Sequence, residues 1–162
     1  MIVADARRIL ALGVEIKALE TRLEALVRDS DLGRRIDSIP GFGLICSAEL
    51  AGEIGTLERF TQEGSLAMYV GMAPLDYQSG STHRSRRPRQ VNRHAKAAMM
   101  VGAAAHAHCC EQAAAYYAKK RSEGKAHNQA VRALGRQLCR VLWSMLHGQR
   151  EYRLPGFEPK SI

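Results

Sequence analysis

The sequence feature that most constrains the fold is a long segment without acidic side chains. No Asp or Glu occurs between Asp76 and Glu111, and arginines crowd into the first half of this segment. Such a segment repels itself unless an anion covers it. Pro74 favours an extended or turning chain at its start, and Pro88 prevents a helix through its middle. We therefore expect an exposed basic arm between two helical parts of the chain.

The apolar composition predicts that the rest of the chain is helical. Apolar residues make up 46% of the 162 residues, but only 6% are aromatic, and most of the others are Ala, Leu, Val, Ile and Met. This mixture favours packed helices over strands. The length suits one compact domain with an appended element. The expected fold class is all-α, a helical bundle.

The net charge of +8 is unevenly distributed along the sequence. Residues 1–76 hold 8 Lys/Arg and 12 Asp/Glu, a net of −4, so residues 77–162 carry +12. A strongly basic half favours DNA or RNA as partner over a membrane. No apolar run approaches the length of a membrane span, and no secretory signal is present. We expect a cytoplasmic, nucleoid-associated protein with reduced core thiols at Cys46, Cys109, Cys110 and Cys139.

The N-terminal residues predict a coiled-coil helix over residues 1–29. Apolar residues recur there in alternating steps of three and four, the a/d pattern of a coiled coil. The g-position charges of Glu15 and Arg22 slightly favour an antiparallel homodimer. Leu10 and Val14 lie off this seam, so packing against the chain's own domain or a larger bundle stays open. The helix starts at Met1 without a cap, and we expect more protein upstream. The seam consists of Ile9, Leu12, Ile16, Leu19, Leu23 and Leu26.

A turn of sequence IPGFG, residues 39–43, separates two predicted short helices at 32–38 and 44–54. Pro40 ends the first helix, and the glycines permit a tight turn with positive φ. The pattern resembles the helix-hairpin-helix motif. In that motif, backbone N–H groups and the N-terminus of the second helix hold a DNA phosphate. Gly41 and Gly43 are therefore predicted phosphate contacts.

The alternative for this stretch is a plain corner between two helices, because Glu49 and Glu53 on the second helix would disfavour a nearby phosphate. Further helices are predicted near 61–70, from residue 90 into an alanine-rich stretch, from 112 to 124, and over 126–147. Residues 30–152 would form the helical domain, and 153–162 a flexible tail.

Ser79 and Gly80 stand at the head of the basic arm. A hydroxyl beside a residue without a side chain, where a bulky backbone could approach, marks Ser79 as a candidate nucleophile. Ser-Gly is also a common loop dipeptide, and a basic run is often only solvated surface. Ser81 and Ser85 are rivals not followed by glycine. The candidate nucleic-acid contacts here are Gly80, Arg84, Arg86, Arg87, Arg89, Asn92, Arg93 and Lys96.

The order of several motifs resembles a known family. In sequence they are IPGFG, AELAGEIG, YVGMAP, YQSG, NRHAK, AYYAKKRSEGK and RALGRQLCRVLW. This order resembles the C-terminal (Tnp) domain of insertion-sequence transposases related to the Piv DNA invertase, also called bridge recombinases. The resemblance covers roughly residues 36–150. One departure is Gln90-Val91, where the family usually has a Lys/Arg-Gly pair.

The resemblance implies a mechanism and a set of partners. In that family an N-terminal RuvC-like domain, whose four acidic residues bind divalent metal, precedes a coiled coil and this domain. The serine of the Ser-Gly motif, here Ser79, forms a covalent link to a DNA strand. Members assemble as dimers or tetramers and use a structured guide RNA. We expect no cofactor in this chain, Mg²⁺ in the absent RuvC-like domain, and no DNA cleavage by the chain alone.

Two other interpretations remain open. The chain could be a non-catalytic module that binds DNA or RNA through the helix-hairpin-helix and the arm, or it could mainly assemble subunits. His106 and Cys110 share a helix face and could suggest a metal site with their neighbours His108 and Cys109. Zinc would need two more ligands from elsewhere, and we expect these side chains to serve packing.

Overall fold

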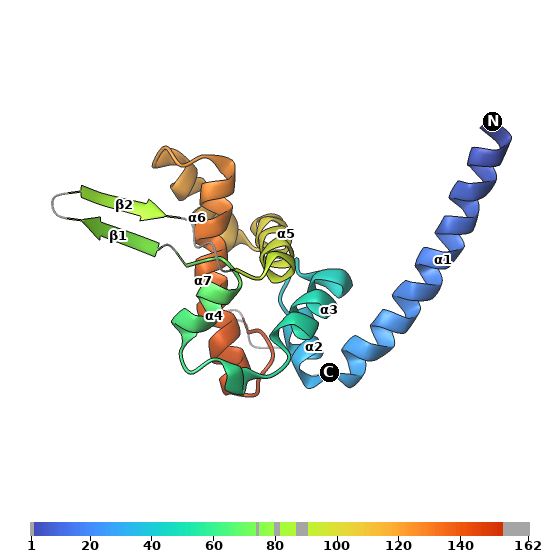
Figure 1. The fold of residues 1–162 in the computed structure, drawn as a ribbon, viewed down its shortest axis with the longest axis horizontal. Helices are drawn as coiled ribbons and strands as arrows, with labels where there is room; N and C mark the ends of the chain where they lie inside the picture. The colour runs from blue at the N-terminus through green and yellow to red at the C-terminus, as the bar shows by residue number, and fades with distance from the viewer. Residues whose placement is uncertain (1, 74, 80–81, 87–90, 154–162) are drawn as a thin grey trace.

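A computed structural model describes residues 2–73, 75–79, 82–86 and 91–153, with only the backbone described in the two short strands. The chain folds into a helical body from which a long N-terminal helix and a β-hairpin project in different directions (Figure 1). Among the described residues, no helix combines the length and apolar character that crossing a bilayer requires. The predicted tail lies mostly outside the described residues.

The body consists of helices that pack around one central helix, α5 (Figure 1). Its core is mostly aliphatic, with Leu50, Leu66, Met99 and Leu142 buried together. The prediction of an all-α bundle is confirmed for this body, and the predicted helices agree with those observed to within a few residues. Their bounds are α2 Asp31–Asp37, α3 Gly43–Ile54, a 3₁₀ turn η1 at Leu57–Arg59, α4 Glu63–Tyr69, α5 Arg93–Cys109, α6 Glu111–Ser122 and α7 His127–His147.

The N-terminal helix α1, Ile2–Asp29, matches the predicted helix over 1–29. Its seam is open to solvent along most of its length: Ile9 is 70% exposed and Leu19 is 60% exposed. Only its last turns reach the body, where Val27 is buried. The alternative in which this helix packs against its own domain is therefore wrong for all but those last turns. Its pairing with another chain stays a prediction.

The basic arm contains a β-hairpin, which is a departure from the purely helical prediction. Strand β1, Leu75–Ser79, pairs antiparallel with β2, Thr82–Arg86. The sequence indicated extended chain here but not strands, because neither segment alternates apolar and polar residues over its length. The hairpin satisfies backbone groups by pairing them with each other. It can therefore stand away from the body, as Figure 1 shows.

The IPGFG turn has the expected positive φ values, +92° at Gly41 and +57° at Gly43. A Cβ at Gly41 would come within 2.4 Å of the backbone nitrogen of His106 on α5, whereas a Cβ at Gly43 would meet open space. The buried imidazole of His106 donates from Nδ1 to the Pro40 carbonyl at 2.7 Å. Gly41 thus lets the turn dock directly on the α5 backbone.

Hydrogen bonds among Glu53, Tyr69 and Asn92 close the base of the arm, and this group of bonds is here called the clasp. The Asn92 backbone N–H donates to the Tyr69 carbonyl at 3.0 Å. Its side-chain amide donates to the Tyr69 hydroxyl at 2.8 Å and to the Glu53 carboxylate. The Tyr69 hydroxyl donates in turn to the Glu53 carbonyl at 2.9 Å. The clasp joins the residues just before and just after the arm to α3.

Asn92 also caps α5, because its side-chain oxygen accepts from the Ala95 N–H at 3.0 Å. Asn92→Ala should remove both the cap and the side-chain bonds of the clasp and lower the free energy of unfolding by about 2–3 kcal/mol. Asn92→Ser should keep a capping hydroxyl but lose the amide bonds of the clasp, at a cost of about 1 kcal/mol. Urea denaturation followed by circular dichroism measures both. Equal losses for the two variants would contradict separate roles for the two side-chain atoms.

The two glycines of the IPGFG turn provide a matched pair of test substitutions. Gly43→Ala should cost about 1–2 kcal/mol, since the strain of a positive φ is the only penalty there. Gly41→Ala should cost several kcal/mol, because the new methyl group would also overlap the backbone of α5. Thermal unfolding of both variants tests this order. A smaller loss for Gly41→Ala than for Gly43→Ala would show that the turn does not dock on α5 as described.

Candidate nucleic-acid interface

The register of the hairpin fixes where Ser79 lies relative to the arginines of the arm. Ser79 is paired with Thr82, Tyr77 with Arg84, and Leu75 with Arg86. Paired residues of an antiparallel ladder belong to the same face, and so do alternate residues along one strand. Ser79, Arg84 and Arg86 therefore occupy one face of the hairpin. The backbone alone brings the candidate nucleophile and two cationic residues onto a common surface.

The other face of the hairpin carries a different set of residues. Asp76 is paired with Ser85, and Gln78 with His83. Ser85, a rival for the role of nucleophile, is thus separated from the Ser79 face. The predicted site residues Gly80, Arg87 and Arg89 and the rival Ser81 lie outside the described residues, as does the hydroxyl of Ser79.

The start of α5 carries the remaining basic residues predicted as contacts. Arg93 is exposed in the first turn, and Lys96 is half-buried. The aliphatic stem of Lys96 passes over Gly71, whose Cβ position lies 2.9 Å from the lysine Cδ. Gly71 has a φ of +69° and ends α4. Asn92 uses its side-chain amide and oxygen within the clasp and the cap, so its observed role is to hold the arm in place.

The N-terminus of α3 is the second predicted phosphate site. Gly43 is exposed, and the N-cap residue Phe42 offers no side-chain acceptor to the first turn. Uncapped N–H groups at a helix start attract anions through their own partial charges and the helix dipole. Gly41, in contrast, faces α5. The geometry thus leaves Gly43 open to a phosphate and gives Gly41 a role in packing.

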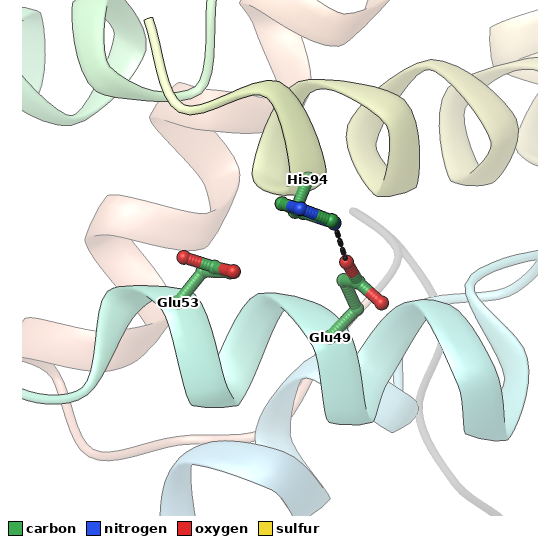
Figure 2. A group of neighbouring side chains, drawn as sticks. All are labelled: Glu49, Glu53 and His94. Carbon is green, nitrogen blue, oxygen red and sulfur yellow. Dashed lines mark ion pairs between the residues drawn. The ribbon is translucent and has the colours of Figure 1, made fainter.

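A cluster that was not predicted from the sequence joins α3 to α5. Glu49 and Glu53 lie one turn apart on α3, and His94 reaches them from the first turn of α5 (Figure 2). The His94 Nδ1 lies 3.0 Å from a Glu49 carboxylate oxygen. Potential ligand atoms of all three lie within 4.8 Å of one another, a donor set that could hold a metal ion.

Each member of this cluster also has a protein partner, since Glu49 pairs with His94 and Glu53 accepts from Asn92. From sequence, Glu49 and Glu53 were expected only to hinder the binding of a phosphate. Their spacing of four residues did indicate a common helix face. No sequence signal placed His94 beside them, because that contact depends on how α3 crosses α5.

The cysteines are all free thiols. Cys110 and Cys139 are buried and Cys46 is half-buried, but Cys109 is exposed, contrary to the expected core position. Burial raises the pKa of Cys139 to about 12. Burial, reinforced by the Glu49 charge, also raises the pKa of Cys46. Both thiols therefore stay protonated at neutral pH, which makes them poor nucleophiles.

Comparisons of the sequence with family models and with known proteins agree on one family. The model of the family described as Transposase IS116/IS110/IS902 matches residues 33–118. A 44.8 kDa protein of insertion element IS116 from Streptomyces clavuligerus is 34% identical over 90% of this chain and 37% of its own length. A 42 kDa protein of insertion element IS900 from Mycobacterium paratuberculosis is 36% identical over 91% of this chain and 37% of its own.

A more distant relative carries a functional name. The transposase for insertion sequence element IS1111A from Coxiella burnetii is 24% identical over 83% of this chain and 38% of its own length. The chain thus spans little more than a third of the relatives it matches. The family model covers more than half of the chain, and two relatives match about nine tenths of it at over 30% identity. This chain therefore belongs to the transposase IS116/IS110/IS902 family.

Proposed function

We propose that this chain is the DNA-binding and strand-transfer part of an insertion-sequence transposase, with Ser79 as the nucleophile. The observation that carries this proposal is the register of the hairpin, which assigns Ser79, Arg84 and Arg86 to one face. Family membership supports a role in transposition. The expectation of a covalent link between serine and DNA comes from the resemblance of the sequence to the Piv-type recombinases.

The proposed reaction is a phosphoryl transfer to the serine. The Ser79 oxygen bonds to a backbone phosphorus, the bond from that phosphorus to a deoxyribose oxygen breaks, and the released oxygen takes up a proton. A serine hydroxyl is a weak nucleophile, so a base must remove its proton and cations must offset the charge that develops on the phosphate. Arg84 and Arg86 are suited to the second task.

The base has to come from outside the arm. Asp76 and His83 are the residues between 75 and 91 whose side chains are suited to act as a base, and they are paired with Ser85 and Gln78 on the face opposite Ser79. We place the base and a Mg²⁺ site in an RuvC-like domain, as the resemblance to the recombinase family suggests. The chain alone should then bind DNA but not cut it.

The same surface would hold the nucleic acid in place. Arg84, Arg86, Arg87 and Arg89 in the arm, with Arg93 and Lys96 on α5, would contact phosphates and position the strand without reading its sequence. The exposed N–H groups around Gly43 would hold a further phosphate. A structured guide RNA presents the same backbone chemistry and could use the same contacts.

Assembly is proposed to occur through α1. The exposed seam on this helix would be covered by α1 of a second copy, in a homodimer or in a tetramer built from such pairs. Apolar side chains at a and d positions are shielded from water only when a partner helix is present. Pairing would also bring together active-site parts contributed by different copies.

An alternative function is a non-catalytic module that binds DNA or RNA and dimerises. Such a module would bind nucleic acid through the same arm and pair through the same α1 seam, but Ser79 would have no chemical role. Mutation of that serine separates the two functions, because a binding module loses nothing when one hydroxyl is removed.

In the full-length protein, Ser79→Ala should abolish recombination, a loss of at least about a thousandfold, because no other group can form the covalent link. DNA affinity should stay within about twofold. Ser85→Ala on the opposite face is the matched control and should retain recombination. A plasmid recombination assay together with a gel-shift titration gives both readouts. Normal recombination by Ser79→Ala would remove this serine from the mechanism and favour the binding module.

Arg84→Ala combined with Arg86→Ala should weaken binding of the 162-residue chain to duplex DNA and flatten its dependence on salt. The slope of log affinity against log salt decreases by about 0.9 for each phosphate that is no longer neutralised. Arg7→Ala with Arg8→Ala on α1 removes the same charge from an exposed helix and should leave the slope unchanged. Fluorescence anisotropy across a range of salt concentrations measures the slope. Salt-independent affinity in the unmodified chain would indicate a role in assembly alone.

A further inference from the structure

A second basic region lies where α6 ends and α7 begins. Residues 119–132 contain five basic residues and a single acidic one, Glu123. Glu123 forms an ion pair with Lys120 at 2.9 Å, and this hydrogen bond lowers the pKa of its carboxyl group. Lys119 and Arg121 are exposed and have no carboxylate partner in the part of the chain that the structure describes. This end of the body therefore carries uncompensated positive charge.

A cavity of about 310 Å³ lies beside this charge, between α5, α6 and α7. Its polar and aromatic lining comes from His108, Tyr117 and His127. The Tyr117 hydroxyl and the His127 Nδ1 are 2.8 Å apart, and their rings meet edge to face with centroids 5.8 Å apart. Small aliphatic residues form the remainder of the lining: Ala104, Ala107, Ala114 and Val131. The volume is at the lower end of the range for small-molecule pockets.

The charge and the cavity are parts of one surface. Arg121 follows Tyr117 by one helical turn and so shares its face of α6. A guanidinium nitrogen of Arg121 donates to the Lys125 carbonyl at 2.7 Å, which ties the end of α6 to the segment that leads into His127. An aromatic ring in a small cavity, bordered by cations, is the arrangement that proteins use for an unpaired base and its flanking phosphates.

We propose that this surface is a second nucleic-acid site, in which an unpaired nucleobase enters the cavity against Tyr117. Arg121 and Lys125 would hold the adjoining phosphates. The ligand class is a single-stranded or bulged segment of DNA or RNA, since bases within an intact duplex are not free to enter.

This site is separate from the one proposed for the arm. Arg93 at the start of α5 and His108 near its end are 15 residues apart, or about 22 Å along the helix axis. A transposase with two such sites could hold a duplex at the arm and an unpaired strand at the α6–α7 end. Base binding at this end does not require Ser79 to be the nucleophile, so the two assignments can fail or succeed independently.

The test uses the 162-residue chain and three labelled probes: a twelve-nucleotide single-stranded DNA, an RNA of the same sequence, and the blunt DNA duplex. Tyr117→Leu should weaken single-strand binding about 5- to 100-fold, because base stacking on an aromatic ring is lost. It should change duplex binding less than twofold. Tyr117→Phe keeps the ring and should stay within about threefold of the unmodified chain. The DNA and RNA probes show which strand the site prefers.

Arg121→Ala with Lys125→Ala tests the proposed binding of phosphates. Single-strand affinity should fall, and the salt slope should decrease by about 0.7 for each phosphate that is no longer neutralised. Arg7→Ala with Arg8→Ala is again the charge-matched control. The arm variant Arg84→Ala with Arg86→Ala should show the reverse pattern, with its larger loss of affinity on the duplex.

The inference would be overturned if Tyr117→Leu bound single strands with full affinity, or if it lost affinity equally for single strands and duplex. Failure of the unmodified chain to bind either single strand would also overturn it. Circular dichroism melting checks that each variant is folded. If Tyr117→Leu unfolds, the charge variant decides the question. An unchanged salt slope in Arg121→Ala with Lys125→Ala would then overturn the proposed site.

Discussion

The position of the basic arm depends on one asparagine. Twenty-two residues separate Tyr69 from Asn92, and closing a loop of this length costs conformational entropy. Asn92 offsets that cost with bonds to Tyr69 on one side of the arm and to Glu53 on α3. Its side-chain oxygen simultaneously starts α5. The same residue thus ends the arm and begins the helix around which the body packs.

The composition of α5 follows from how closely its neighbours approach it. Phe42 lies against Gly102, where a Cβ would come within 2.9 Å of the ring, and the turn at Gly41 meets the backbone at His106. Larger side chains at these positions would push the IPGFG turn away from the helix. The small-residue sequence of α5, in which Ala95, Gly102 and Ala103 are buried, is therefore a packing requirement. It also makes this helix a rigid spacer between the arm at one end and the cavity of α6 and α7 at the other.

Local sequence signals predicted the helices well, and long-range contacts account for what they missed. Apolar periodicity and the alanine-rich stretch indicated the long helices, and α3 and α4 are each followed by a glycine with positive φ, Gly55 and Gly71. The hairpin was missed because most of its residues are polar and its stability comes from pairing between strands. The clasp and the His94 contact were missed because they join residues 23 to 45 positions apart in sequence. Ser79 became a candidate nucleophile because of its neighbour Gly80 and the family resemblance; that role stays a prediction, and the backbone register puts Ser79 on the same face of the hairpin as Arg84.

The exposed seam of α1 has a consequence for how the protein would respond to its own abundance. If two copies must join through this helix, the number of pairs follows the law of mass action. Well below the dissociation constant, halving the number of chains leaves only a quarter as many pairs. In that range the amount of paired chain would rise with the square of its concentration, so any property that needs the pair would depend steeply on expression.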